Sequence, residues 1–158
     1  MQNEDEVPMN SKSKKSIKLS KDYEIEDSIL VIDTLDGMGT GFYISENFVI
    51  SNQHVVEEAN FVNLRTFSGE KFTGEVTASN ISKDLALIKV PKKGIPLKFE
   101  SNCAVNRREN VFTIGHPKGF EYSTSRGIVS SIRNISNPFY KAVGQNIYIQ
   151  IDASISSE

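Results

Sequence analysis

The chain has 158 residues, a formal net charge of -2 and 38% hydrophobic residues, which is the composition of a folded globular domain rather than of a disordered chain. This length suits one compact domain or two small lobes. The near-neutral charge argues against a protein built to hold nucleic acid, and no apolar run approaches the roughly 20 residues of a membrane span. The single cysteine, Cys103, excludes an intrachain disulfide, and one cysteine with two histidines leaves little for a metal site.

Residues 1–25 are predicted to form a polar, Lys-rich tail. They mix acids, lysine and serine without a sustained period, and five lysines lie within residues 11–21. Those lysines could contact phosphate or anionic lipid, but the acidic flanks favour a solvated leader. A secretory signal peptide needs an apolar core after a basic start, and this segment has none. If the start is authentic, the protein is therefore expected to be cytoplasmic.

From residue 26 onward the sequence predicts many short strands. In chain order the segments rich in β-branched and aromatic residues are 28–35, 42–44, 48–51, 61–67, 72–76, 85–90, 111–114, 127–132 and 146–151. Turns are expected at residues 46–47 and 68–69, and in the last strand Ile147, Ile149 and Ile151 share one face. No long helical stripe competes with this pattern. The spacing favours an all-β sandwich or barrel.

Three residues are candidates for chemistry. His54 follows a predicted strand in I-S-N-Q-H-V-V-E, His116 lies in the turn I-G-H-P-K-G, and Asp84 opens the apolar strand D-L-A-L-I-K-V. Either histidine taken alone is more often structural or merely exposed than catalytic. An acid at the head of an apolar strand needs a hydrogen-bonding partner, and a carboxylate paired with an imidazole makes a general base. The residue types alone do not pair either histidine with the acid.

Five segments together resemble trypsin-like serine proteases of the HtrA (Deg) type. The segment G-M-G-T-G-F-Y-I-S-E-N-F-V-I-S-N-Q-H-V-V-E-E-A (37–59) is similar to their histidine region, and S-K-D-L-A-L-I-K-V (82–90) to their D-L-A-L-L-K-V segment. T-I-G-H-P-K-G (113–119), S-R-G-I-V-S-S-I (125–132) and I-Q-I-D-A-S-I-S (149–156) resemble three later segments, in the same order. The resemblance covers about residues 26–158. It implies a double β-barrel in which His54 is the general base, Asp84 orients it, and His116 has no catalytic part.

The chain departs from this family at the nucleophile. The family places its serine in G-N-S-G-G a few residues after the D-A-x-I run, and no G-x-S-G-G occurs in these 158 residues. Ser154, Ser156 and Ser157 lack the glycines that would aim two backbone N–H groups at an oxyanion, so they are interpreted as ordinary loop serines. The chain is expected to be a fragment of a longer protein or else a degenerate homologue, and the fragment is favoured.

The sequence thus predicts an all-β, trypsin-like double β-barrel whose second barrel is incomplete. Residues 1–25 are assigned to the tail, 26–99 to the first barrel with His54 and Asp84, and 100–158 to the connection and the first half of the second barrel. Cys103 falls in that connection as a small, half-buried thiol.

The predicted function is that of a serine endopeptidase, which cleaves unfolded or extended polypeptide through an acyl-enzyme, without metal or cofactor. The 158 residues alone are expected to be inactive, and an oligomer is possible. The alternatives are a non-catalytic homologue that binds extended peptides and an unrelated β-barrel binding module.

Overall fold

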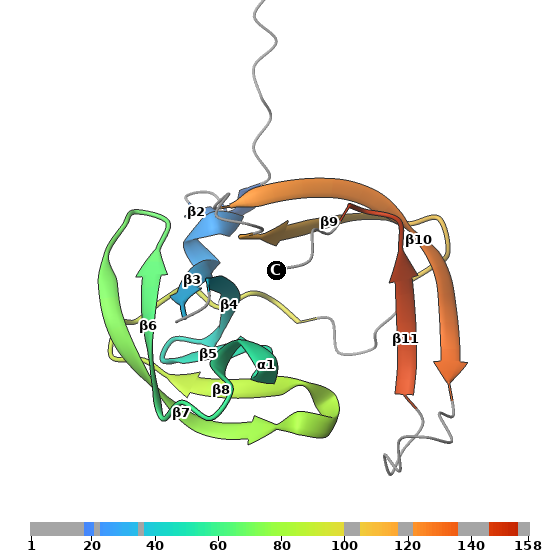
Figure 1. Cartoon of the computed structure of the whole chain (residues 1–158). Coiled ribbons are helices and arrows are strands. Elements are labelled where there is room, and N and C mark those ends of the chain that lie inside the picture. The colour runs from blue at the N-terminus through green and yellow to red at the C-terminus, as the bar shows by residue number, and fades with distance from the viewer. Residues whose placement is uncertain are drawn as a thin grey trace, which may run out of the picture.

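Six antiparallel strands close into a barrel in the order β3-β4-β5-β8-β7-β6 (Figure 1). The strands are β3 (Ile29–Asp33), β4 (Met38–Ser45), β5 (Phe48–Ser51), β6 (Phe61–Thr66), β7 (Lys71–Asn80) and β8 (Leu85–Lys89). The computed structural model describes residues 18–20, 23–34, 37–99, 105–116, 122–135 and 146–154. The predicted all-β fold class is confirmed by this barrel and by the sheet that follows it.

Two strands of the barrel are longer than their sequence predicts. The expected strand at 42–44 lies in the second half of β4, which begins at Met38, and the expected strand at 72–76 lies in the first half of β7. Gly39 and Gly41 lie before the strand predicted at 42–44, yet they are buried residues of β4, and a Cβ on Gly39 would overlap the side chain of Val55. Glycine is therefore needed there for close packing rather than for a turn.

The barrel core follows the two-residue period of its strands. Inward positions alternate with exposed ones, as in β6, where Val62 and Leu64 are buried and their neighbours are not. The buried cluster consists of Leu30, Ile32, Tyr43, Val49, Val55, Val56, Val62, Leu64, Ala86, Ile88 and Val90. Complete burial of one such aliphatic side chain stabilises the fold by about 1.5–3 kcal/mol, so this cluster is what keeps the barrel closed.

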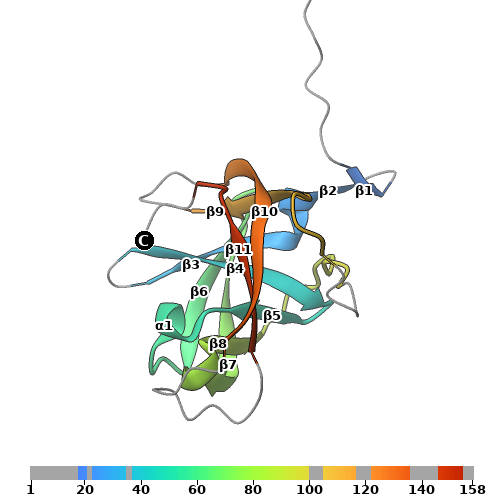
Figure 2. The same ribbon diagram turned by 90° about the vertical axis from the view of Figure 1, so that its right-hand side faces the viewer.

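A second sheet has three antiparallel strands in the order β11-β10-β9, which are β9 (Asn110–Gly115), β10 (Ser123–Ile135) and β11 (Asn146–Ile151). Strand β10 is twice as long as its predicted segment, 127–132, and it arches over the barrel and then runs down beside β11 (Figures 1 and 2). Within the described residues β11 pairs only with β10. Its Ile147 and Ile149 are 64% and 42% exposed, so this sheet is open where the barrel is closed.

The two lobes meet at the outer face of β3. Ile29 and Val31 point away from the barrel core and are nevertheless buried. Tyr122, at the start of β10, donates its hydroxyl hydrogen to the Ile29 carbonyl oxygen at 3.3 Å. Its ring also packs edge-on against Phe67, with 4.7 Å between ring centroids. The second sheet therefore covers the apolar outer face of β3, which the barrel core does not bury.

A short hairpin and a helical turn lead into the barrel. Strand β1 (Lys18–Ser20) pairs with β2 (Tyr23–Glu24), and the 3₁₀ turn η1 (Ile25–Ser28) follows. The hairpin lies inside the predicted tail, where strands of two or three residues are too short to show a period. Among the described residues, no helix has the length and apolar character needed to cross a membrane.

Candidate active site

His54 lies on a single helical turn at the end of β5. The turn is α1 (Gln53–Val56), and Val55 and Val56 are buried in the barrel core. Because these valines anchor one side of the turn, the imidazole is directed outward, and its side chain is 62% exposed. The site is therefore supported by the packed barrel without being enclosed by it.

Asp84 lies at the corresponding end of the neighbouring strand. The 3₁₀ turn η2 (Ile81–Lys83) connects β7 to it, and the Asn80 side chain caps that turn by accepting a hydrogen bond from the Lys83 N–H at 2.9 Å. Asp84 itself has a left-handed backbone, with φ 52° and ψ 51°, a conformation that Asp tolerates better than most residues. The pairing of Ser51 with Ala86 places the segment after β5 beside the residue before β8.

The two side chains make a direct contact. His54 Nδ1 lies 2.7 Å from Asp84 Oδ2, and the His54 backbone N–H donates to Asp84 Oδ1 at 2.9 Å. Asn52 Nδ2 also donates to Asp84 Oδ2, at 3.0 Å, and to the Asp84 carbonyl oxygen, at 3.2 Å. The carboxylate is thus held by three donors from one short segment.

These hydrogen-bond donors lower the pKa of Asp84. Partial burial alone would raise the pKa of Asp84, but the hydrogen bonds from the His54 backbone and ring, the attraction of the ring's charge, and the Asn52 amide together hold that pKa below its usual value. An ionised Asp84 accepts hydrogen bonds and donates none. His54 Nδ1 must therefore carry the proton of this contact, which leaves the lone pair of the neutral ring on Nε2. A ring in this tautomer can remove a proton from a nucleophile and later return it.

The residues that the sequence analysis considered and gave no catalytic part lie elsewhere or outside the described residues. His116 is buried at the lobe junction, where its Nδ1 accepts a hydrogen bond from the Tyr122 backbone N–H at 3.0 Å. Ser154 follows β11, and its carbonyl oxygen accepts a hydrogen bond from Ser125 Oγ at 2.7 Å. Ser156, Ser157 and Cys103 lie outside the described residues. Within the described ranges, no group of three or more His, Cys, Asp or Glu side chains could hold a metal ion.

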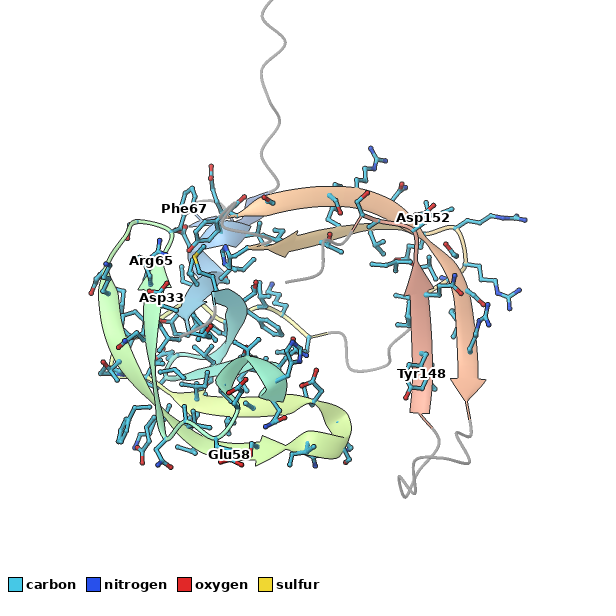
Figure 3. All side chains as sticks on the ribbon, viewed as in Figure 1. Asp33, Glu58, Arg65, Phe67, Tyr148 and Asp152 are labelled. Atoms are coloured by element: carbon cyan, nitrogen blue, oxygen red, sulfur yellow. The ribbon has the colours of Figure 1, made fainter. Side chains whose placement is uncertain are left out.

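Two residues with structural roles were missed, one at the site and one in the second sheet. Asn52 is part of the histidine motif, but nothing in its type or place in the sequence indicated a contact with Asp84. Asp152, in the D-A-S-I run, accepts a hydrogen bond from the Ile128 N–H at 2.6 Å and lies on the second sheet (Figure 3). That run was compared with a family motif, but nothing in the sequence indicated which backbone group its acid would bind.

Comparisons with known proteins all find proteases. Residues 39–157 match the family model described as a trypsin-like peptidase domain. A probable periplasmic serine endoprotease, DegP-like, from Chlamydia muridarum is 33% identical over 95 residues, which are 59% of this chain and 19% of that protein. A protein of the same description from Ectopseudomonas mendocina is 32% identical over 122 residues, which are 75% of this chain and 25% of that protein. The chain thus spans a quarter or less of the length of these curated relatives.

Solved structures agree with the sequence relatives. The crystal structure of the Rv3671c protease in an inactive form superposes with a TM-score of 0.72 at 26% identity, covering 83% of this chain and 68% of that one. A second crystal structure, of an inactive mutant of Rv3671c from M. tuberculosis H37Rv, gives a TM-score of 0.73 at 27% identity, covering 83% of this chain and 65% of that one. These matches confirm the predicted trypsin-like fold.

The comparisons also correct one prediction. The relatives from both bacteria are named periplasmic proteins, which contradicts the cytoplasmic location predicted from residues 1–25. That prediction depended on the lack of an apolar leader in those residues, and such a lack does not decide the compartment.

Proposed function

The chain belongs to the trypsin-like peptidase domain family, and from that premise we propose that the protein is a serine endopeptidase of the HtrA type. The observation that carries the proposal is the 2.7 Å contact between His54 Nδ1 and Asp84 Oδ2. An acid that remains ionised and holds one ring nitrogen in its protonated form prepares the other nitrogen to act as a base. The substrate under this proposal is an unfolded or extended polypeptide.

In the proposed reaction His54 is the general base and Asp84 the residue that orients it. His54 Nε2 takes the proton of a serine hydroxyl while the serine oxygen bonds to the peptide carbonyl carbon. The imidazolium then gives that proton to the leaving amine as the C–N bond breaks, which leaves an acyl-enzyme. Water repeats the sequence on the ester and releases the acid product. Asp84 stays ionised throughout and stabilises the imidazolium.

The nucleophile of this scheme is proposed to lie outside residues 1–158. No G-x-S-G-G occurs in the sequence, and a base paired with an acid has nothing to activate without a nucleophile. The proposed division of the chain is a tail at 1–25, a first barrel at 26–99 and part of a second barrel at 100–158. The 158 residues by themselves are therefore expected not to hydrolyse peptide bonds.

A second candidate function is the binding of extended peptides without hydrolysis. One observation favours it: among the described residues β11 pairs only with β10, and its Ile147 and Ile149 are exposed. A strand edge of this kind can pair with an extended peptide through backbone hydrogen bonds. The two candidates make opposite predictions about covalent labelling of a serine.

The test begins with the codons that follow Glu158. If they encode G-x-S-G-G, the protein expressed through that motif should react with a fluorophosphonate and degrade an unfolded protein substrate. His54→Ala should lower kcat by at least about 10³-fold, whereas the matched variant Glu58→Gln, at an exposed position just after α1, should keep the full rate.

Three results would count against the endopeptidase. One is a rate that does not change in His54→Ala. Another is peptide hydrolysis by residues 1–158 that Ser156→Ala or Ser157→Ala abolishes, because the nucleophile would then lie within the chain. The third is binding of extended peptides without any fluorophosphonate labelling, which would favour the second candidate.

A further inference from the structure

Asn52 occupies a position where its side chain would ordinarily cap a helix. It is the residue before α1, with an extended backbone at φ -75° and ψ 147°. Asn at this position usually accepts a hydrogen bond from an N–H of the first helical turn. In α1, all of whose residues are described, the Asn52 side chain makes no such bond. The amide is therefore used for something other than starting the helix.

The amide reaches across to the neighbouring strand and contacts Asp84 twice. Its Nδ2 lies 3.0 Å from Asp84 Oδ2 and 3.2 Å from the Asp84 carbonyl oxygen. A side-chain amide has two N–H bonds, so one hydrogen can serve each acceptor. Asp84 Oδ2 is the same oxygen that lies 2.7 Å from His54 Nδ1. Asp84 Oδ2 thus accepts one hydrogen bond from His54 and a second one from Asn52.

The second contact concerns the backbone of Asp84. Its left-handed conformation is unfavourable for a residue with a Cβ and persists where surrounding contacts hold it. The bond from Asn52 to the Asp84 carbonyl oxygen ties that backbone to the segment that carries His54. One amide therefore fixes both where Asp84 stands and how its carboxylate is turned.

We propose that Asn52 is a positioning residue of the active site, which locks the Asp84 carboxylate toward His54 Nδ1 by donating to its carboxylate and carbonyl oxygens. The structural part of this proposal stands on the contacts alone, and its effect on rate rests on the proposed endopeptidase function. Because the bond to the carboxylate is charge-assisted and solvent-exposed, its loss should have a moderate effect on the acid–base pair.

The test replaces Asn52 with leucine, which keeps the branched shape and the neutral charge but removes the donor. Asn52→Ala serves as a second variant if leucine disturbs folding. The matched control is Asn47→Leu, at the other end of β5, because Asn47 Nδ2 also donates to a carbonyl oxygen, that of Val90 at 3.3 Å. In the 158-residue chain, carbon NMR follows the ionisation of Asp84, and proton NMR follows the exchange of the His54 Nδ1 hydrogen with water.

In Asn52→Leu the acid dissociation constant of Asp84 should fall about three- to tenfold, and the Nδ1 hydrogen should exchange about tenfold faster. Asn47→Leu should change neither. In the protein carrying its nucleophile, kcat should fall about tenfold while KM stays within about twofold, because an interaction with the base, not with substrate, is lost.

An unchanged ionisation of Asp84 and an unchanged Nδ1 exchange would overturn the proposal, as would equal changes in Asn47→Leu. Altered NMR signals with an unaltered kcat would overturn the effect on rate. If the NMR changes occur but no form of the protein reacts with a fluorophosphonate, the proposed endopeptidase function fails while the clamp on Asp84 stands.

Discussion

Raising the pH above 10 is expected to destabilise the first barrel through one side chain, the buried phenol of Tyr43. Its ring lies in the barrel core and against the backbone of Gly94, and its hydroxyl donates to the Lys92 carbonyl oxygen at 3.1 Å. Burial, with a smaller contribution from the charge of Glu70, raises the pKa of Tyr43 from 10.0 to about 12. The neutral phenol is therefore favoured in the folded chain, and the phenolate is favoured in the unfolded one.

The sign and size of the effect follow from that pKa. Between pH 10 and pH 12 the unfolded chain binds fewer protons at Tyr43 than the folded chain, so the free energy of unfolding falls as pH rises. The stabilisation is complete below pH 10 and is lost as pH rises through about 12. Since one pKa unit corresponds to about 1.4 kcal/mol, the loss over this window amounts to about 3 kcal/mol.

Tyr43→Phe isolates this contribution, because the variant has the same ring and no titrating group. Below pH 10 it should be less stable than the wild type by about 1 kcal/mol, the net value of one hydrogen bond. The two stability curves should cross near about pH 11, above which the variant is the more stable protein. Urea denaturation followed by circular dichroism at several pH values measures both curves, and every other titrating group is common to them. Parallel curves from pH 9 to pH 12 would refute this reasoning.

Three further outcomes are expected. Gly127→Ala should destabilise the second sheet by about 1–3 kcal/mol, because its Cβ would overlap the backbone of Ala153. In the control Gly115→Ala the new Cβ meets only a side-chain oxygen at 3.4 Å, so stability should change little. Thermal unfolding compares the two variants, and equal losses of stability would contradict this packing. The ionised Asp84 should stabilise the folded chain above the pKa of an unfolded aspartate, and this stabilisation should be lost as pH falls through the lower pKa of the folded state. The stability difference between wild type and Asp84→Asn should therefore shrink on acidification. A difference that grows would contradict the lowered pKa. In the 158-residue chain, amide hydrogen exchange should be fast in β9–β11 and slow in the barrel, because Ile147 and Ile149 are exposed on a strand that pairs only with β10 among the described residues. Equally strong protection of both lobes would contradict this and would mean that the three-stranded sheet is stable without further strands.

Much of the fold could be predicted because short-range sequence patterns reflect burial. Alternation in 61–67 and the apolar run in 85–90 correspond to β6 and β8, whose buried side chains face the barrel core. The alternation of apolar and polar residues did not predict a strand where glycine, which has no side chain, faces the core. The strand predicted at 42–44 left out the glycines of β4, because the fit of a glycine depends on what lies opposite it, which is Val55 for Gly39.

The candidate site divides in the same way. Sequence motifs singled out His54 and Asp84, the proposed base and acid, because both stand in segments with recognisable neighbours. Their contact across 30 residues of chain depends on the register that sets Ser51 opposite Ala86, and register is decided by the packing of the whole barrel.

The sequence by itself determined the fold class and the family resemblance, and it singled out the two residues that we propose as base and acid, since local residue patterns carry each of these. Only the tertiary structure decided that Asn52 clamps Asp84 instead of capping α1, and that His116 is buried at the lobe junction. A polar side chain can bind any donor or acceptor within reach. Which of them is within reach depends on segments that are distant in sequence and adjacent only after folding.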